Sequence, residues 1–313
     1  MESIDGVLLV DKGKDMTSHD VVAVARRSLG TKKIGHCGTL DPMAAGVLPL
    51  CIGRATRIMD YLDPDIKTYR CEMVLGVRTD TWDIWGNVIE DDRDRFIKPD
   101  TEAVVRTFQS FTGEIFQMPP LYSAIRMGGR HLYEYAREGK EVKIEKRPVI
   151  IHRLHILNYD EANARITFDL QCSKGTYVRS ICHEAGEALG CGGSMSFLLR
   201  TESGAFRLEE AVTPEELSDD WQGHMMPVDY PLARLGKAEI EGNSVVRFKN
   251  GGELKLSETK ILQRPLESGG STHIRMREGL DRAYCVYAGA MFLGVALFDE
   301  EKELFKADKV LSE

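Results

Sequence analysis

The chain has 313 residues and a net charge of −8, with 42% hydrophobic and 29% charged residues; this composition is typical of a folded globular protein and argues against a general nucleic-acid binder. No stretch approaches the ~20 apolar residues that span a bilayer, and the start "MESIDGVLLVDKGKDM" carries acids where a secretory signal would be basic. None of the seven cysteines forms a CxxC pair, so we expect free thiols in a reducing, cytoplasmic location rather than a zinc ribbon or a thioredoxin motif.

Strands and helices are mixed along the first two thirds of the chain. The apolar run at 6–12 predicts a short buried strand, and alternation at 69–77 and 165–172 predicts strands with one buried face. Apolar residues at helical spacing predict helices over 18–30 and 177–190. Because the order contains no regular βαβ repeat, an α+β fold is favoured over a doubly wound sheet.

The composition changes near residue 231. Residues 202–241 carry ten acids and three bases, a net charge of −7, and several prolines interrupt this region. Short strand-like runs follow at 244–250, 283–299 and 304–311, with "NGGE" predicting a turn. We expect two domains, 1–230 and 231–313, the second being a small β-barrel. The alternative is a C-terminal hairpin that packs on the main sheet.

One segment is basic although the protein is acidic. Residues 113–153 contain eight basic and five acidic residues, a net charge of +3. Such a segment can bind a polyanion locally. The alternative is a solvated helix face, and charge alone does not decide between the two.

Asp41 and Arg179 are the first candidate site residues. The loop "GHCGTLDPMAAGVLPL" places a single carboxylate, Asp41, between a glycine-rich segment and a proline; an Asp in that position commonly only starts a turn. Arg179 falls in the expected first turn of a helix, where the helix dipole disfavours a cation. The side chain of an arginine placed there either reaches solvent or binds a carboxylate through its planar guanidinium. Asp41 is the candidate partner.

Tyr69 and His36 are two further candidates. By alternation, Tyr69 faces the same side as Cys71 and Met73, which is also what an ordinary core tyrosine would do. His36 lies five residues before Asp41 in a loop flanked by glycines. It could carry a proton, stack on a base or simply form a turn.

Several motifs together resemble TruB-type tRNA pseudouridine synthases, in order, from about Ile4 to Phe206. They are "GHCGTLDPMAAGVLPLCIGRATR", "KTYR", "GVRTDTWDIWG", "QMPPLYSAIRMGGRHLYEYAREG" and "CSKGTYVRSICHEAGEALGCGG". The C-terminal region resembles, more weakly, the PUA RNA-binding module. The resemblance implies a mixed, mainly antiparallel central sheet flanked by helices, with an RNA-binding insertion at about 113–153.

The resemblance also implies a reaction and its residues. A uridine in the TΨC loop of tRNA, uridine 55, is flipped out, detached from its ribose and rejoined through carbon, without a cofactor. Asp41 would be the nucleophile, oriented by Arg179, while Tyr69 would stack on the uracil and assist proton removal. The residues implied in substrate binding are His36, Leu198, Lys12, Arg126, Arg130 and Tyr177. The implied partner is the T arm of tRNA, with no membrane, and the protein would be a monomer.

The sequence departs from the family pattern in two places. In "KGKD", Lys12 is kept, but Gly13 replaces a common proline and Asp15 a common glycine, so the loop should be less rigid. In "CGGSMSFLLRTESG", Ser194 and Leu199 replace a common His and Arg. We expect the changes at Ser194 and Leu199 to weaken a contact with RNA more than they affect the catalytic step.

Three other functions compete with this interpretation. A non-catalytic RNA chaperone would keep the scaffold with Asp41 as a structural residue only. A guide-RNA-dependent synthase would rely on partner proteins, and the insertion at 113–153, which is typical of stand-alone enzymes, argues against it. A glycoside hydrolase is disfavoured because no second carboxylate is placed to complete the usual acid pair.

Overall fold

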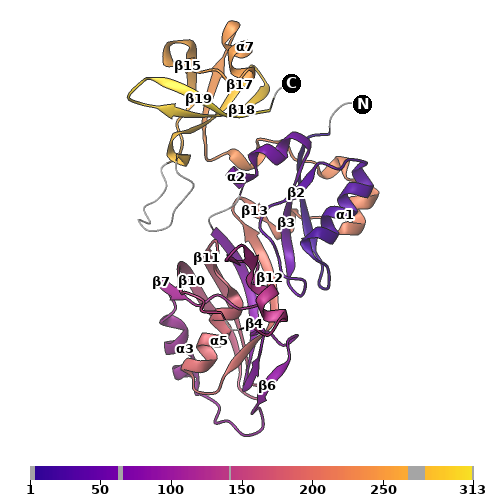
Figure 1. Cartoon of the computed structure of the whole chain (residues 1–313), viewed down its shortest axis with the longest axis vertical. Helices are drawn as coiled ribbons and strands as arrows, with labels where there is room; N and C mark the ends of the chain where they lie inside the picture. The colour runs from indigo at the N-terminus through magenta and orange to yellow at the C-terminus, as the bar shows by residue number, and fades with distance from the viewer. Residues whose placement is uncertain (1–3, 63–65, 141, 267–278, 312–313) are drawn as a thin grey trace. The chain divides into compact units, whose positions relative to one another are not determined.

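The computed structural model describes residues 4–62, 66–140, 142–266 and 279–311 (Figure 1). By its internal contacts the chain divides into two compact units. We call residues 1–41, 47–64 and 204–313 unit 1, and residues 42–46 and 65–203 unit 2. This division does not test the boundary expected at residues 230/231, which stays a prediction. Within the described residues, no helix combines the length and apolar character that crossing a membrane requires.

Unit 2 is built on one antiparallel sheet (Figure 1). Its strands, in spatial order, are β12 (Gly193–Ser203), β4 (Ile66–Leu75), β11 (Arg165–Ser173), β10 (Arg147–Asp160) and β7 (Gly113–Gln117). Ile166, Phe168 and Leu170 of β11 are fully buried, as their alternation predicts. The expectation of a mainly antiparallel central sheet is confirmed.

Helices α3 (Thr101–Gln109) and α5 (Val178–Ala188) flank this sheet. Phe108 of α3 meets Phe168 of β11 edge to face, with ring centroids 5.1 Å apart. Helix α5 begins at Val178, so Arg179 does fall in its first turn. The shorter elements of unit 2 are β5 (Val77–Thr79), β6 (Val88–Asp91), β8 (Arg126–Met127), β9 (Arg130–His131) and α4 (Leu132–Arg137).

Unit 1 begins with β1 (Gly6–Lys12), which pairs with β3 (Ala45–Ile52), and β2 (Ile34–His36) pairs with β3 as well. Helix α1 (Ser18–Leu29) starts at a capping box of Thr17 and Asp20. It ends at Gly30, whose φ of +65° is the left-handed cap that a glycine provides. The predicted helix and its end are confirmed. The chain continues through the 3₁₀ helix η1 (Gly53–Ile58) and α2 (Met59–Leu62), and later through β13 (Phe206–Arg207) and α6 (Pro214–Asp219).

The C-terminal part of unit 1 is a curled six-stranded sheet (Figure 1), which confirms the predicted small β module. Its strands, in spatial order, are β15 (Leu254–Lys255), β19 (Leu304–Val310), β18 (Met291–Asp299), β17 (Ala283–Ala288), β14 (Gly236–Ile240) and β16 (Thr259–Gln263). Residues 267–278, 312 and 313 of the expected barrel lie outside the described residues.

The strand predicted at 244–250 is wrong, because these residues form helix α7 (Asn243–Lys249). Ser244 and Phe248, four residues apart, are its buried positions, which is the spacing of one helix face. The glycines of "NGGE" close this helix instead of turning a hairpin. The N–H of Gly251 donates to the Phe248 carbonyl at 2.8 Å and that of Gly252 to the Arg247 carbonyl at 2.9 Å.

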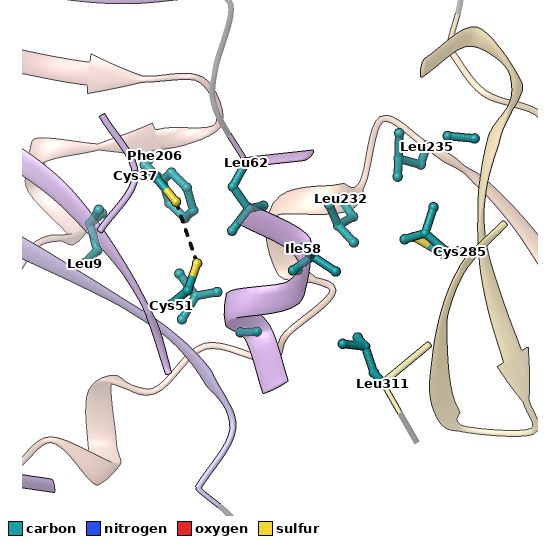
Figure 2. Packing of buried hydrophobic residues seen from close by; sticks show 14 of the residues in the cluster. Leu9, Cys37, Cys51, Ile58, Leu62, Phe206, Leu232, Leu235, Cys285 and Leu311 are labelled. Atoms are coloured by element: carbon teal, nitrogen blue, oxygen red, sulfur yellow. Dashed lines mark hydrogen bonds between the residues drawn. The ribbon is translucent and has the colours of Figure 1, made fainter. Parts of the chain in front are cut away.

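A shared hydrophobic core joins the N-terminal segments of unit 1 to its C-terminal sheet (Figure 2). Leu9 and Cys51 come from β1 and β3, and Ile58 from η1. Cys285 of β17 and Leu311 belong to the same buried cluster. The C-terminal sheet is therefore packed into unit 1 and is not a freely tethered module.

We expect Gly46→Ala to destabilise unit 2. Ala45 and Gly46 pair in parallel with Leu199 and Arg200 of β12. Gly46 has φ +105°, and an added Cβ would lie 2.2 Å from the Arg200 carbonyl oxygen. Backbone strain and overpacking together should cost about 2–4 kcal/mol, measurable by denaturant unfolding. The matched control is Gly13→Ala, which meets no atom within 4 Å; equal losses in the two variants would contradict the prediction.

Candidate active site

The residues predicted for the site are divided between the two units. Asp41 and His36 belong to unit 1, whereas Tyr69, Arg179 and Leu198 belong to unit 2. The structure describes each half by itself, and the proposed pairing of Asp41 with Arg179 stays a prediction.

The Asp41 loop is fixed at both of its ends within unit 1. At its start, the Cys37 N–H donates to the Pro49 carbonyl at 2.9 Å, and the Cys37 and Cys51 thiols lie 3.6 Å apart in the core (Figure 2). At its end, Leu40 accepts from and donates to the Ser18 hydroxyl, at 3.3 and 3.0 Å. Asp41 follows directly and is half-buried. The backbone that carries this carboxylate is therefore held from both sides.

His36 and Lys12 occupy different environments in unit 1. The His36 ring meets the His19 ring edge to face at 5.5 Å, and His36 is half-buried. Lys12 is fully buried, and its ammonium donates to the carbonyls of Gly13 and Met16 at 2.9 and 2.7 Å. The Lys12 head group thus fixes the turn in which Gly13 replaced the common proline. A role of Lys12 in substrate binding stays a prediction.

Tyr69 and Leu198 lie on neighbouring strands of unit 2. Tyr69 of β4 is 7% exposed and shares its buried face with Cys71 and Met73, as the alternation predicts. Leu198 of β12 is 6% exposed and is the strand partner of Cys71. The two side chains thus belong to adjacent strands of the same sheet.

Tyr177 is the N-cap residue of α5, and Gln117 of β7 holds its backbone. The Tyr177 N–H donates to the Gln117 side-chain oxygen at 2.7 Å, and the Gln117 amide donates back to the Tyr177 carbonyl at 3.0 Å. The Tyr177 side chain is half-buried. These two bonds fix the start of the helix that presents Arg179.

Arg179 meets an acid that the sequence interpretation missed. Its guanidinium is nearly buried and lies 3.5 Å from the carboxylate of Asp83, which is fully buried. The same group donates to the carbonyls of Thr81 and Tyr122 at 3.2 and 3.1 Å. Of the two sequence alternatives, the one in which Arg179 meets a carboxylate is therefore confirmed, but the carboxylate that the structure shows is Asp83. An ion pair as buried as this one is stable only when further hydrogen bonds satisfy both groups.

Asp83 is oriented by its own loop. One carboxylate oxygen, Oδ1, accepts from the Thr81 hydroxyl at 2.8 Å and from the Trp85 N–H at 3.1 Å. The other, Oδ2, faces Arg179. The Thr79 hydroxyl donates to the Asp83 carbonyl at 2.7 Å. The only sequence signal was the place of Asp83 in "GVRTDTWDIWG", where two acids within four residues give no indication of which one is buried.

The basic segment 113–153 contains a hairpin with β8 and β9 as its strands. Gly128 and Gly129, which join them, have φ of +57° and +83°, as a tight hairpin turn requires. Arg126 is exposed. Arg130 forms ion pairs with Glu134 and Glu138.

Lys140 pairs with Glu138 at 2.8 Å. The Arg130 and Lys140 cations together lower the pKa of Glu138 to about 2. Part of the positive charge that the sequence count assigns to this segment is thus balanced inside it.

The described residues contain no group of three or more His, Cys, Asp or Glu side chains placed to hold a metal ion.

Comparison with known proteins decides the family. Residues 26–178 match the family model for the N-terminal domain of TruB family pseudouridylate synthases, and residues 179–233 match that for the tRNA pseudouridylate synthase B C-terminal domain. A relative from Alkaliphilus oremlandii, named tRNA pseudouridine synthase B, is 39% identical over 98% of both chains. The chain belongs to the TruB family. A second relative of the same name, from Geobacillus kaustophilus, is 46% identical to this TruB-family chain over 81% of it and 92% of its own length.

Solved structures confirm the fold of this TruB-family chain. A chain of "Crystal Structure of a Cbf5-Nop10-Gar1 Complex" superposes with a TM-score of 0.71 at 25% identity, covering 98% of this chain and 85% of that one. A chain of "Structure of H/ACA RNP bound to a substrate RNA containing 2'-deoxyuridine" gives the same TM-score at 23% identity. The predicted pseudouridine synthase fold is thereby confirmed.

We expect Asp83→Asn to destabilise this TruB-family protein by about 3–5 kcal/mol, because it removes one partner of a buried ion pair with Arg179. The measurement is denaturant unfolding of the two proteins. Asp169→Asn is the matched control, since Asp169 pairs with Arg70 at the surface of the same sheet, where an ion pair contributes at most about 1 kcal/mol. A loss no greater for Asp83→Asn than for the control would show that the buried pair does not hold the loop.

Proposed function

We propose that this protein converts uridine 55 in the T loop of tRNA to pseudouridine. The observation that carries the proposal is the identity of 39% over 98% of both chains with a relative named tRNA pseudouridine synthase B. The loop with Asp41, the strand with Tyr69 and the helix with Arg179 supply the residue types that the reaction needs. The reaction is an isomerisation, so atoms balance without any cofactor.

In the proposed reaction the bond between C1′ of the ribose and N1 of the uracil breaks. The Asp41 carboxylate forms a transient covalent bond with the sugar or the base, the base turns, and a bond from C1′ to C5 replaces the original one. The bond to Asp41 breaks before the product leaves, which restores the carboxylate. The proton on C5 leaves and N1 gains one, so the product has the same composition as the substrate. A nucleophile reacts only when it is held in line with the atom that it attacks, so the orientation of Asp41 is the first requirement of this reaction.

The surrounding residues would divide the remaining tasks. Arg179, itself held by Asp83, would orient Asp41 through its second donor edge. Tyr69 would stack on the uracil and assist removal of the C5 proton, while Leu198 would pack against the ring. His36 would help to hold the RNA loop open. Extrusion of the base costs a few kcal/mol, which contacts to the rest of the T arm would offset.

The basic segment 113–153 is the proposed binding surface for the T arm of tRNA. Arg126 lies exposed on its hairpin, and Tyr177 lies where the segment adjoins α5 through Gln117. Because Arg130 and Lys140 share Glu138, they would contribute less per residue than Arg126. The cytoplasmic location and the monomeric state remain predictions.

We expect Asp41→Asn to abolish turnover and to leave the fold and tRNA affinity nearly intact, since an amide cannot act as the nucleophile. The loss should exceed a thousandfold, or ~4 kcal/mol of barrier. Unmodified tRNA transcript is incubated with each protein, and pseudouridine is mapped along the chain. Activity of the variant within about tenfold of wild type would contradict the role of Asp41, and pseudouridine at another position would contradict the choice of uridine 55. A wild type that binds tRNA without modifying it would favour an RNA chaperone.

Neutralising Arg126, Arg130 and Lys140 together should raise the KM for tRNA and flatten its salt dependence, because each lost phosphate contact removes about 0.7–0.9 from the slope of log K against log salt. The rate at saturating tRNA should change less. Arg106→Gln is the matched control, because Arg106 is paired with Glu102 on α3, outside the segment. An unchanged salt slope in the triple variant would place the phosphate contacts elsewhere, most directly on the C-terminal sheet.

A further inference from the structure

Trp82 adopts a backbone conformation that bulky residues rarely tolerate. Its φ is +64°, in the left-handed region. Its backbone is clamped to β12: the Met195 N–H donates to the Trp82 carbonyl at 3.0 Å, and the Ile84 N–H donates to the Met195 carbonyl at 2.9 Å. A conformation of this kind persists only where the surroundings enforce it, and such residues concentrate at functional sites. Asp83, the partner of Arg179, is the next residue.

The indole of Trp82 lies flat on the imidazole of His183. The ring centroids are 4.4 Å apart and the planes are inclined by 4°. His183 follows Arg179 by four residues on α5, so the two side chains share one face of the helix. Burial lowers the pKa of His183; the Glu187 carboxylate raises this pKa in part, and the Arg78 cation lowers it further. This shift favours the neutral imidazole.

The stack and the ion pair join the same two elements. The loop between β5 and β6 contacts α5 through Trp82 on His183 and, one helical turn earlier, through Asp83 on Arg179. Without the stack, the backbone at Trp82 could relax to negative φ. That change would rotate the adjoining Asp83 carboxylate away from the guanidinium.

We propose that Trp82 and His183 are positioning residues for Arg179, and that their stack holds the strained loop so that Asp83 and the Thr81 carbonyl receive the guanidinium in one orientation. The inference rests on the proposed function, in which Arg179 orients Asp41. The effect is on the reacting geometry and not on tRNA binding. It should therefore lower kcat and leave KM nearly unchanged.

The first measurement does not depend on activity. Proton–nitrogen NMR of the arginine side chains should show separate, slowly exchanging guanidinium signals for Arg179, identified by their loss in Arg179→Lys. Trp82→Ala should average or broaden these signals. Trp85→Ala is the matched control, because Trp85 lies in the same loop with an exposed side chain, and alanine keeps the backbone N–H that donates to Asp83. Unchanged Arg179 signals in Trp82→Ala would overturn the proposal.

The second measurement is kcat at saturating tRNA. Trp82→Ala and His183→Ala should each lose about tenfold, or ~1.4 kcal/mol of barrier, whereas Trp85→Ala stays within twofold. Trp82→Phe and His183→Phe keep two stacked rings and should recover to within threefold of wild type, which also covers the case that an alanine variant misfolds. In an Asp83→Asn background, Trp82→Ala should lower kcat only slightly further, since both changes act through Arg179.

The two proposals fail in different ways. If the wild-type protein shows no turnover on tRNA, the proposed function is overturned, and with it the proposed effect of the Trp82–His183 stack on catalysis. The NMR signals would still decide whether the stack holds Arg179. An active wild type with full additivity of Trp82→Ala and Asp83→Asn, or with a rise in KM alone, would overturn the positioning role.

Discussion

The buried ion pair between Arg179 and Asp83 is the interaction on which the candidate site in unit 2 depends. Two opposite charges lie almost out of water at 3.5 Å, an arrangement that is tolerable only if the remaining donors and acceptors are satisfied. Two carbonyls also accept from the guanidinium, and a hydroxyl and a backbone N–H donate to the carboxylate. The pair therefore fixes the loop, the helix and their mutual position at once. Because Asp83 already holds the Arg179 guanidinium in one orientation, a contact with a second carboxylate would require little further ordering of the arginine.

The Asp41 loop of unit 1 depends instead on apolar burial. The cluster containing Cys37 and Cys51 also contains Ile58, Leu232 and Cys285, so the strand before the Asp41 loop shares its core with the C-terminal sheet. The Ser18 hydroxyl then fixes Leu40 beside Asp41. Changes in the C-terminal sheet can thus reach the loop through packing, because a close-packed core transmits strain.

The sequence predicted helices and strands correctly where the apolar residues follow a single spacing, either that of a helix or that of a strand. The strand β11 and the helices α1 and α5 follow from alternation, helical spacing and a C-terminal glycine. Helix α7 did not, because two valines and a phenylalanine in a seven-residue run favour a strand locally, whereas its buried positions, Ser244 and Phe248, have the spacing of a helix face.

The same distinction applies to the site residues: local sequence patterns predict some of them, and contacts between distant segments decide the others. The motifs identified Asp41, Tyr69 and Arg179 as candidates, and strand alternation predicted the buried face of Tyr69. Asp83 could not be found in this way, because its burial and its partner, 96 residues away, arise only when the loop folds onto α5. For the same reason, counting charges over 113–153 could not reveal that Glu138 balances Arg130 and Lys140.

The central claim is that Arg179, held by Asp83, orients Asp41 toward the uridine. The most direct measurement is a crystal structure of the Asp41→Asn protein with an RNA stem-loop of the tRNA T arm. The account predicts that Arg179 keeps its contact with Asp83 and lies within ~4 Å of the side-chain oxygen at position 41, with the uridine extruded beside Tyr69. A complex in which Arg179 contacts only Asp83 and position 41 lies well beyond that distance, with no bridging water, would contradict the account.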